Sequence, residues 1–318
     1  MATNRVVQLE PGVFIIDHDF QGVPGVIASY LLAGDHDLTL IETGATPTIE
    51  NLLDGVRQAG FDPEEITQLA VTHIHLDHAG SAGVLMRRFP RTRLLVHPFG
   101  APHMIDPTKL MASATRIYGN RMEALWGEVA PVPAERVDIL EDGARFNAGG
   151  RELVALHTPG HAMHHTAYHD PATNHVYTGD VGGVRLDSAS YVRPPTVPPE
   201  LDLMLWRASI ERLRALNPRR FYLTHFGGFD NVSWHLDDLL CRLFYWSGWT
   251  DAHLERESDT TVVTEALRQL GDAEIVAACG DDRLVRPYEV ATSYQMTVDG
   301  IARYLRKRRS QAEPARLY

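Results

Sequence analysis

Apolar and polar positions alternate along the first third of the chain, and the period of this alternation changes from that of a strand to that of a helix. Short runs of branched and aromatic residues, bounded by Gly, Pro and Asp, predict strands over residues 13–16, 28–32 and 38–41. The next apolar residues have helical spacing, at Ile49, Leu52, Leu53 and Val56. We therefore predict a helix over residues 47–59 that ends at Gly60, then a buried strand over 68–72 and a helix over 82–89.

The middle of the chain changes character. Residues 98–133 are rich in Met, Ala and aromatic residues and contain five prolines, which predicts a helical insertion with helices near 108–118 and 120–126. Two interpretations of this insertion stay open: it forms an apolar wall of the functional site, or it is plain helix packing.

A second block rich in β-type residues follows the insertion. It predicts strands over residues 137–140, 144–146, 152–157, 166–169, 175–178 and 221–224. A helix over 201–216 interrupts the strands, and the tail from residue 231 is mostly helical. We expect a catalytic domain over residues 1–230 and a helical extension over 231–318 that packs on the same domain.

Composition excludes several classes of protein. Of the 318 residues, 44% are hydrophobic, and 30 Lys and Arg against 41 Asp and Glu give a net charge of −11, which disfavours nucleic acid and anionic membranes as partners. The chain shows neither a signal-like start nor a membrane-spanning apolar run, so we expect a cytoplasmic protein. Because Cys241 and Cys279 are isolated, any metal must be held by histidine and carboxylate.

The strongest chemical signal is the run His73-Ile74-His75-Leu76-Asp77-His78, directly after the strand predicted over 68–72. Histidines at positions i and i+2 of an extended segment project to the same side, so His73 and His75 can bind one ion together. Asp77 and His78 follow where the chain turns into a helix, and they can face a second ion.

Three further candidates stand at the ends of predicted strands. His161 follows the strand ending at 157, Asp180 follows the strand ending at 178, and His225 follows the strand ending at 224. Loops at strand ends gather into functional sites, so these residues can complete the ligand set of two ions.

These motifs resemble those of the metallo-β-lactamase-fold superfamily, at residues 72–80, 158–161, 178–180 and 223–225. The resemblance covers residues 30–225 and implies an α/β fold, an αββα sandwich with a dinuclear metal centre at one edge of the two sheets. It further implies that His73, His75 and His161 hold one ion, that Asp77, His78 and His225 hold the other, and that Asp180 bridges them.

Departures from the family pattern narrow the resemblance. True β-lactamases usually have a cysteine near the position of Asp180 and a signal peptide, and this chain has neither, so it resembles the glyoxalase II-like branch instead. Ser81 replaces the second glycine of that branch's Asp-His-x-Gly-Gly ending. Glu42 stands where aspartate is usual, and we expect Glu42 and His165 to support the ligands through hydrogen bonds.

The activity implied is that of a metal-dependent hydrolase, in which a hydroxide between two ions attacks a small ester, thioester or lactone and Asp77 moves the proton. Alternatives are a mononuclear iron persulfide dioxygenase, which leaves some ligand positions unused, and a phosphodiesterase, which needs a basic groove. Zinc is the first expectation for the metal, with iron or manganese as alternatives. We expect a small-molecule substrate, no nucleic acid or membrane partner, and a monomer or homodimer.

Among the other histidines, we expect His18, His36, His169 and His175 to be exposed and His164 to be structural.

Overall fold

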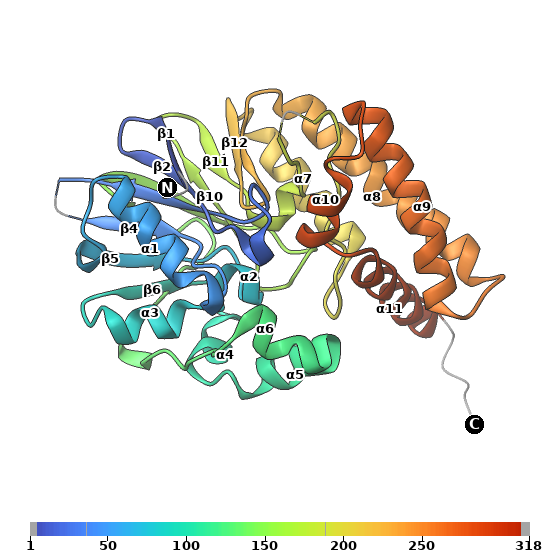
Figure 1. Ribbon diagram of the computed structural model, residues 1–318, viewed down its shortest axis with the longest axis horizontal. Coiled ribbons are helices and arrows are strands. Elements are labelled where there is room, and N and C mark those ends of the chain that lie inside the picture. The colour runs from blue at the N-terminus through green and yellow to red at the C-terminus, as the bar shows by residue number, and fades with distance from the viewer. Residues whose placement is uncertain (1–4, 36, 188, 313–318) are drawn as a thin grey trace.

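Two β-sheets lie face to face in the centre of the protein, and helices cover the outer face of each (Figure 1). The computed structural model describes residues 5–35, 37–187 and 189–312, so His36 lies outside the described residues. Among the described residues, no helix is both long enough and apolar enough to cross a membrane.

The first sheet has seven strands in chain order: β1 (Val6–Glu10), β2 (Val13–Asp17), β3 (Ala28–Ala33), β4 (Leu38–Ile41), β5 (Ile66–Ala70), β6 (Arg93–Val96) and β7 (Val137–Ile139). The strands from β1 to β4 pair antiparallel, and those from β4 to β7 pair parallel. The parallel half brings the carboxyl ends of β4, β5 and β6 to the same edge of the sheet.

The second sheet has six strands: β8 (Arg145–Ala148), β9 (Arg151–His157), β10 (Thr166–Asp170), β11 (His175–Tyr177), β12 (Arg220–Leu223) and β13 (Gly227–Phe229). Only β11 and β12 pair parallel within this sheet. The crossover between them contains α7 (Leu203–Ala215), which covers the outer face.

Strand β2 shows why the sheets pack as they do. Val13 and Ile15 point into the layer between the two sheets, whereas Phe14 and Ile16 point toward the helices on the other side. Both faces of the strand are thus apolar, as a strand in the middle of a layered fold requires. The inter-sheet layer is also joined by a polar contact, because the hydroxyl of Tyr30 donates to the carbonyl oxygen of Leu223 at 2.6 Å.

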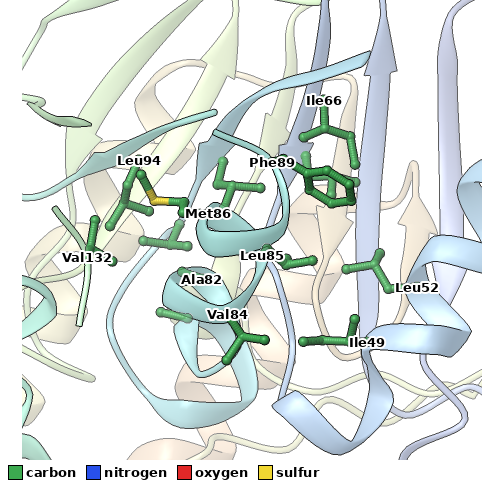
Figure 2. Close-up of a cluster of buried hydrophobic side chains, with 14 of the residues drawn as sticks. Ile49, Leu52, Ile66, Ala82, Val84, Leu85, Met86, Phe89, Leu94 and Val132 are labelled. Carbon is green, nitrogen blue, oxygen red and sulfur yellow. The ribbon is translucent and has the colours of Figure 1, made fainter. Parts of the chain in front are cut away.

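Helices α1 (Ile49–Gln58) and α3 (Ala82–Arg88) cover the first sheet. Figure 2 shows Ile49 and Leu52 of α1 beside Leu85 of α3, over the strand that carries Ile66. These apolar residues recur at helical spacing, so each helix presents one buried stripe to the sheet.

The insertion and the tail are both helical. The insertion forms α4 (Ala101–Ile105), α5 (Thr108–Tyr118) and α6 (Met122–Trp126). The tail forms α8 (Val232–Leu254), α9 (Thr260–Cys279), α10 (Val285–Ala291) and α11 (Tyr294–Ala312). Helix α8 packs beside α7 on the second sheet, and α9 and α11 continue outward from it (Figure 1).

The structure differs from the sequence expectations in local features. The strand expected over 68–72 is β5, which ends at Ala70, because the amide of Thr72 donates to the Glu42 side chain rather than to a neighbouring strand. His18 is buried rather than exposed, since its ring nitrogens bond the hydroxyls of Ser29 and Thr48 at 2.7 and 2.9 Å.

Candidate metal centre

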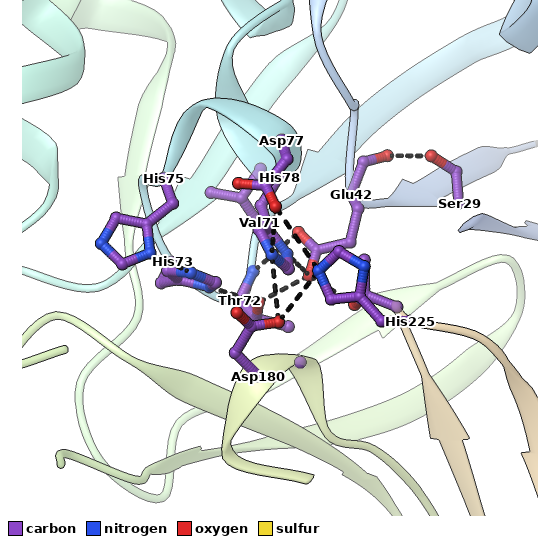
Figure 3. Close-up of polar contacts among 12 residues, drawn as sticks. Ser29, Glu42, Val71, Thr72, His73, His75, Asp77, His78, Asp180 and His225 are labelled. Atoms are coloured by element: carbon purple, nitrogen blue, oxygen red, sulfur yellow. Dashed lines mark hydrogen bonds and ion pairs between the residues drawn. The ribbon is translucent and has the colours of Figure 1, made fainter. Parts of the chain in front are cut away.

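Loops from both sheets bring the predicted ligand residues to one edge of the sandwich (Figure 3). His73 and His75 lie between β5 and the short helix α2 (Leu76–Ala79), which carries Asp77 and His78. The loops after β9, β11 and β12 supply the other three residues, His161, Asp180 and His225. The seven residues form two neighbouring groups, which together we call the His/Asp cluster.

The first group contains His73, His75, His161 and Asp180. The Nδ1 atom of His75 lies 2.8 Å from Nε2 of His73 and 2.9 Å from Nε2 of His161. Three imidazole nitrogens therefore face one point. The Oδ2 atom of Asp180 lies 3.3 Å from Nε2 of His161, which adds an anionic oxygen to the same group.

The second group contains Asp77, His78 and His225. The Nε2 atom of His225 lies 3.4 Å from Oδ2 of Asp77. The Oδ1 atom of Asp180 is 3.2 Å from Nε2 of His78 and 3.3 Å from Nε2 of His225. The two oxygens of Asp180 thus face different groups.

Backbone carbonyl groups fix the orientation of two ligand rings. The Nδ1–H of His161 donates to the carbonyl oxygen of Pro195 at 2.8 Å, and the Nδ1–H of His225 donates to that of Val26 at 2.8 Å. A carbonyl oxygen can only accept, so Nδ1 carries a proton in each ring, and Nε2 is the ring atom directed into the cluster.

Glu42 fixes the orientation of two further rings, that of His78 directly and that of His73 through Thr72. Its buried carboxylate accepts from the Nδ1–H of His78 at 3.0 Å, from the hydroxyl of Thr72 at 2.5 Å and from that of Thr224 at 3.2 Å. Because the Thr72 hydroxyl donates to Glu42, it accepts from the Nδ1–H of His73 at 3.0 Å. The Nε2 atoms of both histidines are consequently directed toward the cluster.

His165 lies behind the cluster and contacts the turn that carries Asp180. Its Nε2 accepts from the backbone amide of Val181 at 3.3 Å, and its Nδ1–H donates to the hydroxyl of Thr158 at 2.8 Å. His164 is buried beside it, and its Nδ1 accepts from the amide of Ile74 at 3.4 Å.

Burial and charge act differently across the cluster. Burial, reinforced by His161, lowers the pKa of His75 to about 3, and burial also lowers the pKa of His73 and His161. The three histidines of the first group are therefore neutral nitrogen donors. Burial also opposes protonation of His225, but Asp180 and Asp77 raise the pKa of His225 to about 9. The carboxylates of Asp77 and Asp180 therefore attract positive charge to the second group.

Two observations show that a metal ion suits these residues. The buried atoms His78 Nε2 and Asp180 Oδ1 have no hydrogen-bond partner among the described residues, although both face the centre of the cluster. The donor set of five imidazoles with two carboxylates is also one that divalent ions such as zinc prefer. The His/Asp cluster therefore suggests divalent metal ions.

A cavity of about 280 Å³ opens from the cluster. His75, Asp77 and Asp180 lie on its wall, and so do Tyr118 and Trp126 of the insertion. The insertion thus lines the functional site, and residues of the tail near α10 and α11 line it from another side.

A sequence profile described as the Metallo-beta-lactamase superfamily matches residues 22–225. The chain belongs to this superfamily. It is accordingly a metallohydrolase, and the αββα sandwich and the ordered motifs have the expected arrangement.

The individual relatives of this chain have low sequence identity to it. The "Metallo-beta-lactamase fold-containing protein ST1585" of Sulfurisphaera tokodaii is 24% identical over 208 residues, which cover 64% of this chain and 74% of that protein. A hydroxyacylglutathione hydrolase of Aeromonas hydrophila is 26% identical over 141 residues, 44% of this chain, and the match spans 41% of its own length.

A solved structure matches nearly the whole chain. The metallo-beta-lactamase family protein TTHA1429 from Thermus thermophilus superposes with a TM-score of 0.67 at 19% identity, covering 95% of each chain. The likeness therefore extends to the fold of the insertion and the helical tail.

Sequence reasoning missed the groups that orient the ligands. The carbonyl groups of Pro195 and Val26 have no residue signature, because every residue carries one. The hydroxyls of Thr72, Thr158 and Thr224 directly precede or nearly precede ligand residues, and this adjacency was a usable signal.

Proposed function

We propose that this metallohydrolase cleaves a small carboxylic ester, thioester or lactone at a centre of two divalent metal ions, with zinc as the first expectation. The observation that carries the proposal is the convergence of seven ligand-type side chains into two groups, with one oxygen of Asp180 toward each. His73, His75 and His161 would hold one ion, Asp77, His78 and His225 the other, and Asp180 would bridge them.

Two bound ions would supply a water molecule of lowered pKa and would polarise the carbonyl oxygen of the substrate. In the reaction, the oxygen of water bonds to the acyl carbon, the bond from that carbon to the leaving oxygen or sulfur breaks, and the leaving atom takes a proton. The protein must therefore accept a proton from water and give it to the leaving oxygen or sulfur atom.

Asp77 is placed to carry this proton. Its side chain is 20% exposed and lines the cavity, whereas that of Asp180 is only 5% exposed. Burial alone would raise the pKa of Asp77, but His78 and His225 lower it to about 2, so its side chain is an ionised carboxylate. Glu42 and His165 keep the surrounding ligands in place while this happens.

The structure favours this proposal over the alternatives. A mononuclear iron dioxygenase would leave His78 and His225 unused, yet both rings are fixed by hydrogen bonds with Nε2 directed into the cluster. A phosphodiesterase acting on nucleic acid needs a basic groove, and among the described residues of the cavity wall Arg121 is the one arginine and there is no lysine. A small-molecule substrate fits the cavity and the net charge of −11 better than nucleic acid or a membrane.

The test is metal analysis of protein purified without added metal, followed by assays with lactones, thioesters, aryl esters and phosphodiesters. We expect two metal ions per chain and turnover of esters, thioesters or lactones. The variant Asp180→Ala should bind at most one ion and lose at least a hundredfold in kcat/KM. His169→Gln, outside the cluster on β10, is the control and should keep the metal content and the kcat/KM of the original protein. One iron per chain with oxygen consumption in place of hydrolysis would overturn the proposal.

A further inference from the structure

The cavity beside the His/Asp cluster is polar where the cluster forms its wall and mostly apolar elsewhere. His75, Asp77 and Asp180 form this polar part. The rest of the wall is mostly hydrocarbon, including Ile27, Leu110, Ile117, Leu125 and Trp126 together with prolines of the loop that follows Arg193. A pocket with reactive groups on one part of its wall and mostly apolar walls elsewhere is suited to a ligand that has one polar centre and an apolar body.

The insertion and the tail close this cavity by contacting each other. The hydroxyl of Tyr118, the last residue of α5, lies 3.5 Å from the sulfur of Met296 in α11. Val290 and Ala291 of α10 pack against the same apolar group as Trp126. The apolar walls therefore come from two segments, far apart in sequence, that support each other.

Outside the His/Asp cluster, the cavity wall has one positively and one negatively charged side chain. The charged side chains that line the described cavity there are Arg121, on the insertion, and Glu289, on α10. Glu289 accepts from the amide of Tyr294 at 3.1 Å and lies 3.8 Å from the guanidinium of Arg193. With one cation, one anion and mostly apolar atoms, the wall selects an uncharged ligand body rather than an anionic one.

We propose that this cavity binds the hydrocarbon part of the substrate, so that the preferred substrates are uncharged esters, thioesters or lactones with a medium-length chain. The inference rests on the proposed hydrolase function and adds the substrate class to it. A cavity of about 280 Å³ accommodates roughly nine groups the size of a water molecule or a methylene. Acetyl compounds would leave most of this apolar surface uncovered, and carbons beyond about the ninth would extend past the apolar wall.

The first experiment measures kcat/KM of the metal-loaded protein with two substrate series. One series lengthens the acyl group, from p-nitrophenyl acetate to dodecanoate, and the other lengthens the thiol, from S-ethyl to S-decyl thioacetate. In the series whose variable part enters the cavity, kcat/KM should rise about fourfold per methylene until the cavity is full and then stop rising. The two series together show whether the acyl or the leaving group occupies the cavity.

Variants on one turn of α5 connect the length dependence to the cavity. Ser113 and Ile117 line the cavity, whereas Ala112 is exposed and does not. Ser113→Phe should move the optimum to shorter chains and reduce the preference for the longest accepted chain over the acetyl substrate at least tenfold. Ile117→Ala should move the optimum to longer chains. Ala112→Phe adds the same ring outside the cavity and should leave the optimum unchanged.

A binding measurement separates failure of this inference from failure of the proposed function. Calorimetric titration with 1-octanol and 1-butanol needs no catalysis, and we expect 1-octanol to bind more tightly and Ser113→Phe to weaken it. Hydrolysis of short esters with no length dependence would overturn the inference and leave the hydrolase proposal standing. Tight, Ser113-dependent binding of 1-octanol without hydrolysis of any ester, thioester or lactone would overturn the hydrolase proposal and keep the apolar cavity. Equal binding of the two alcohols would contradict the inference directly.

Discussion

At the scale of single residues, Glu42 shows how one buried carboxylate can hold several parts of the candidate metal centre in place. Its side chain is wholly buried and its backbone has a φ of 67°. Its carboxylate accepts hydrogen bonds from the ring of His78 and from the hydroxyl of Thr72, beside His73. A non-glycine residue in this left-handed conformation is strained, and such strain persists where the surrounding contacts over-determine it. The hydrogen bonds from Thr72, His78 and Thr224 are those contacts.

We therefore predict that Glu42→Gln weakens metal binding by roughly 10- to 100-fold with little change in side-chain size. The amide of Gln removes the negative charge that favours the Nδ1–H tautomer of His78, and its NH2 group meets donors rather than acceptors. Competition with a chromophoric chelator measures the affinity. Glu50→Gln, on the exposed side of α1, is the control and should bind metal as the original protein does. Equal affinity in both variants would contradict the role of Glu42.

At the scale of elements, the helical tail is connected to the ligand His161 through a proline-rich loop. Arg193 begins this loop and is wholly buried, with its guanidinium 3.7 Å from the centre of the Tyr294 ring and 3.8 Å from Glu289. Two residues later, the carbonyl oxygen of Pro195 accepts from His161. The tail thus holds the loop that orients His161, a proposed metal ligand.

We predict that Arg193→Lys lowers the free energy of unfolding by about 2 kcal/mol, because an ammonium loses the planar stacking on Tyr294 in a desolvated position. The variant should also bind the metal of the first group less tightly, since the loop carrying Pro195 is less well held. Urea unfolding and metal analysis measure the two effects. Arg283→Lys, 58% exposed on the same tail, is the control and should change neither. Unaltered stability of Arg193→Lys would show that the stacking is dispensable.

The elements also show which local signals predict structure. The helix predicted over 108–118 has those bounds in α5, because its apolar residues repeat at the helical period and Pro107 and Gly119 bound it. Strands β1 and β13 were not predicted. β1 is a partly exposed edge strand with a mixed pattern, and β13 contains two glycines, so pairing with a neighbour rather than intrinsic preference forms them.

At the scale of the whole molecule, the sequence pointed to the residues that gather in the His/Asp cluster, but not to the groups that hold them in place. Histidine and aspartate at strand ends are rare enough to be recognised from sequence. The carbonyl of Val26 and the cavity wall near Val290 depend on contacts between segments more than a hundred residues apart, which no local pattern encodes. The burial of His18 depends on contacts of shorter range, with Ser29 and Thr48, which lie 11 and 30 residues away and which the residues next to His18 do not indicate.

Stability of the whole protein should fall in mild acid because it contains a buried neutral histidine beneath the metal centre. His235 of α8 is wholly buried, and its Nε2–H donates to the carbonyl oxygen of Gly182, at the end of the turn that carries Asp180, at 2.7 Å. Burial lowers the pKa of His235 from 6.5 to about 4. Between these pH values the unfolded chain binds a proton at His235 that the folded protein does not bind. The contribution of neutral His235 to the free energy of unfolding is therefore complete above pH 6.5 and is lost as the pH falls toward 4.

Each pH unit in that window lowers the free energy of unfolding by about 1.4 kcal/mol. Between about pH 7 and pH 5, the free energy of unfolding of the original protein should therefore fall by about 2 kcal/mol more than that of His235→Gln. Glutamine can donate to the Gly182 carbonyl but does not titrate, so it removes the pH-dependent part alone. Urea unfolding at both pH values gives the four free energies, and titration of the metal ligands cancels in the comparison because both proteins contain them. His169→Gln, at a partly exposed histidine of β10, should keep the original pH dependence. If His235→Gln and the original protein lose the same free energy on acidification, then α8 does not make the protein acid-sensitive through this histidine.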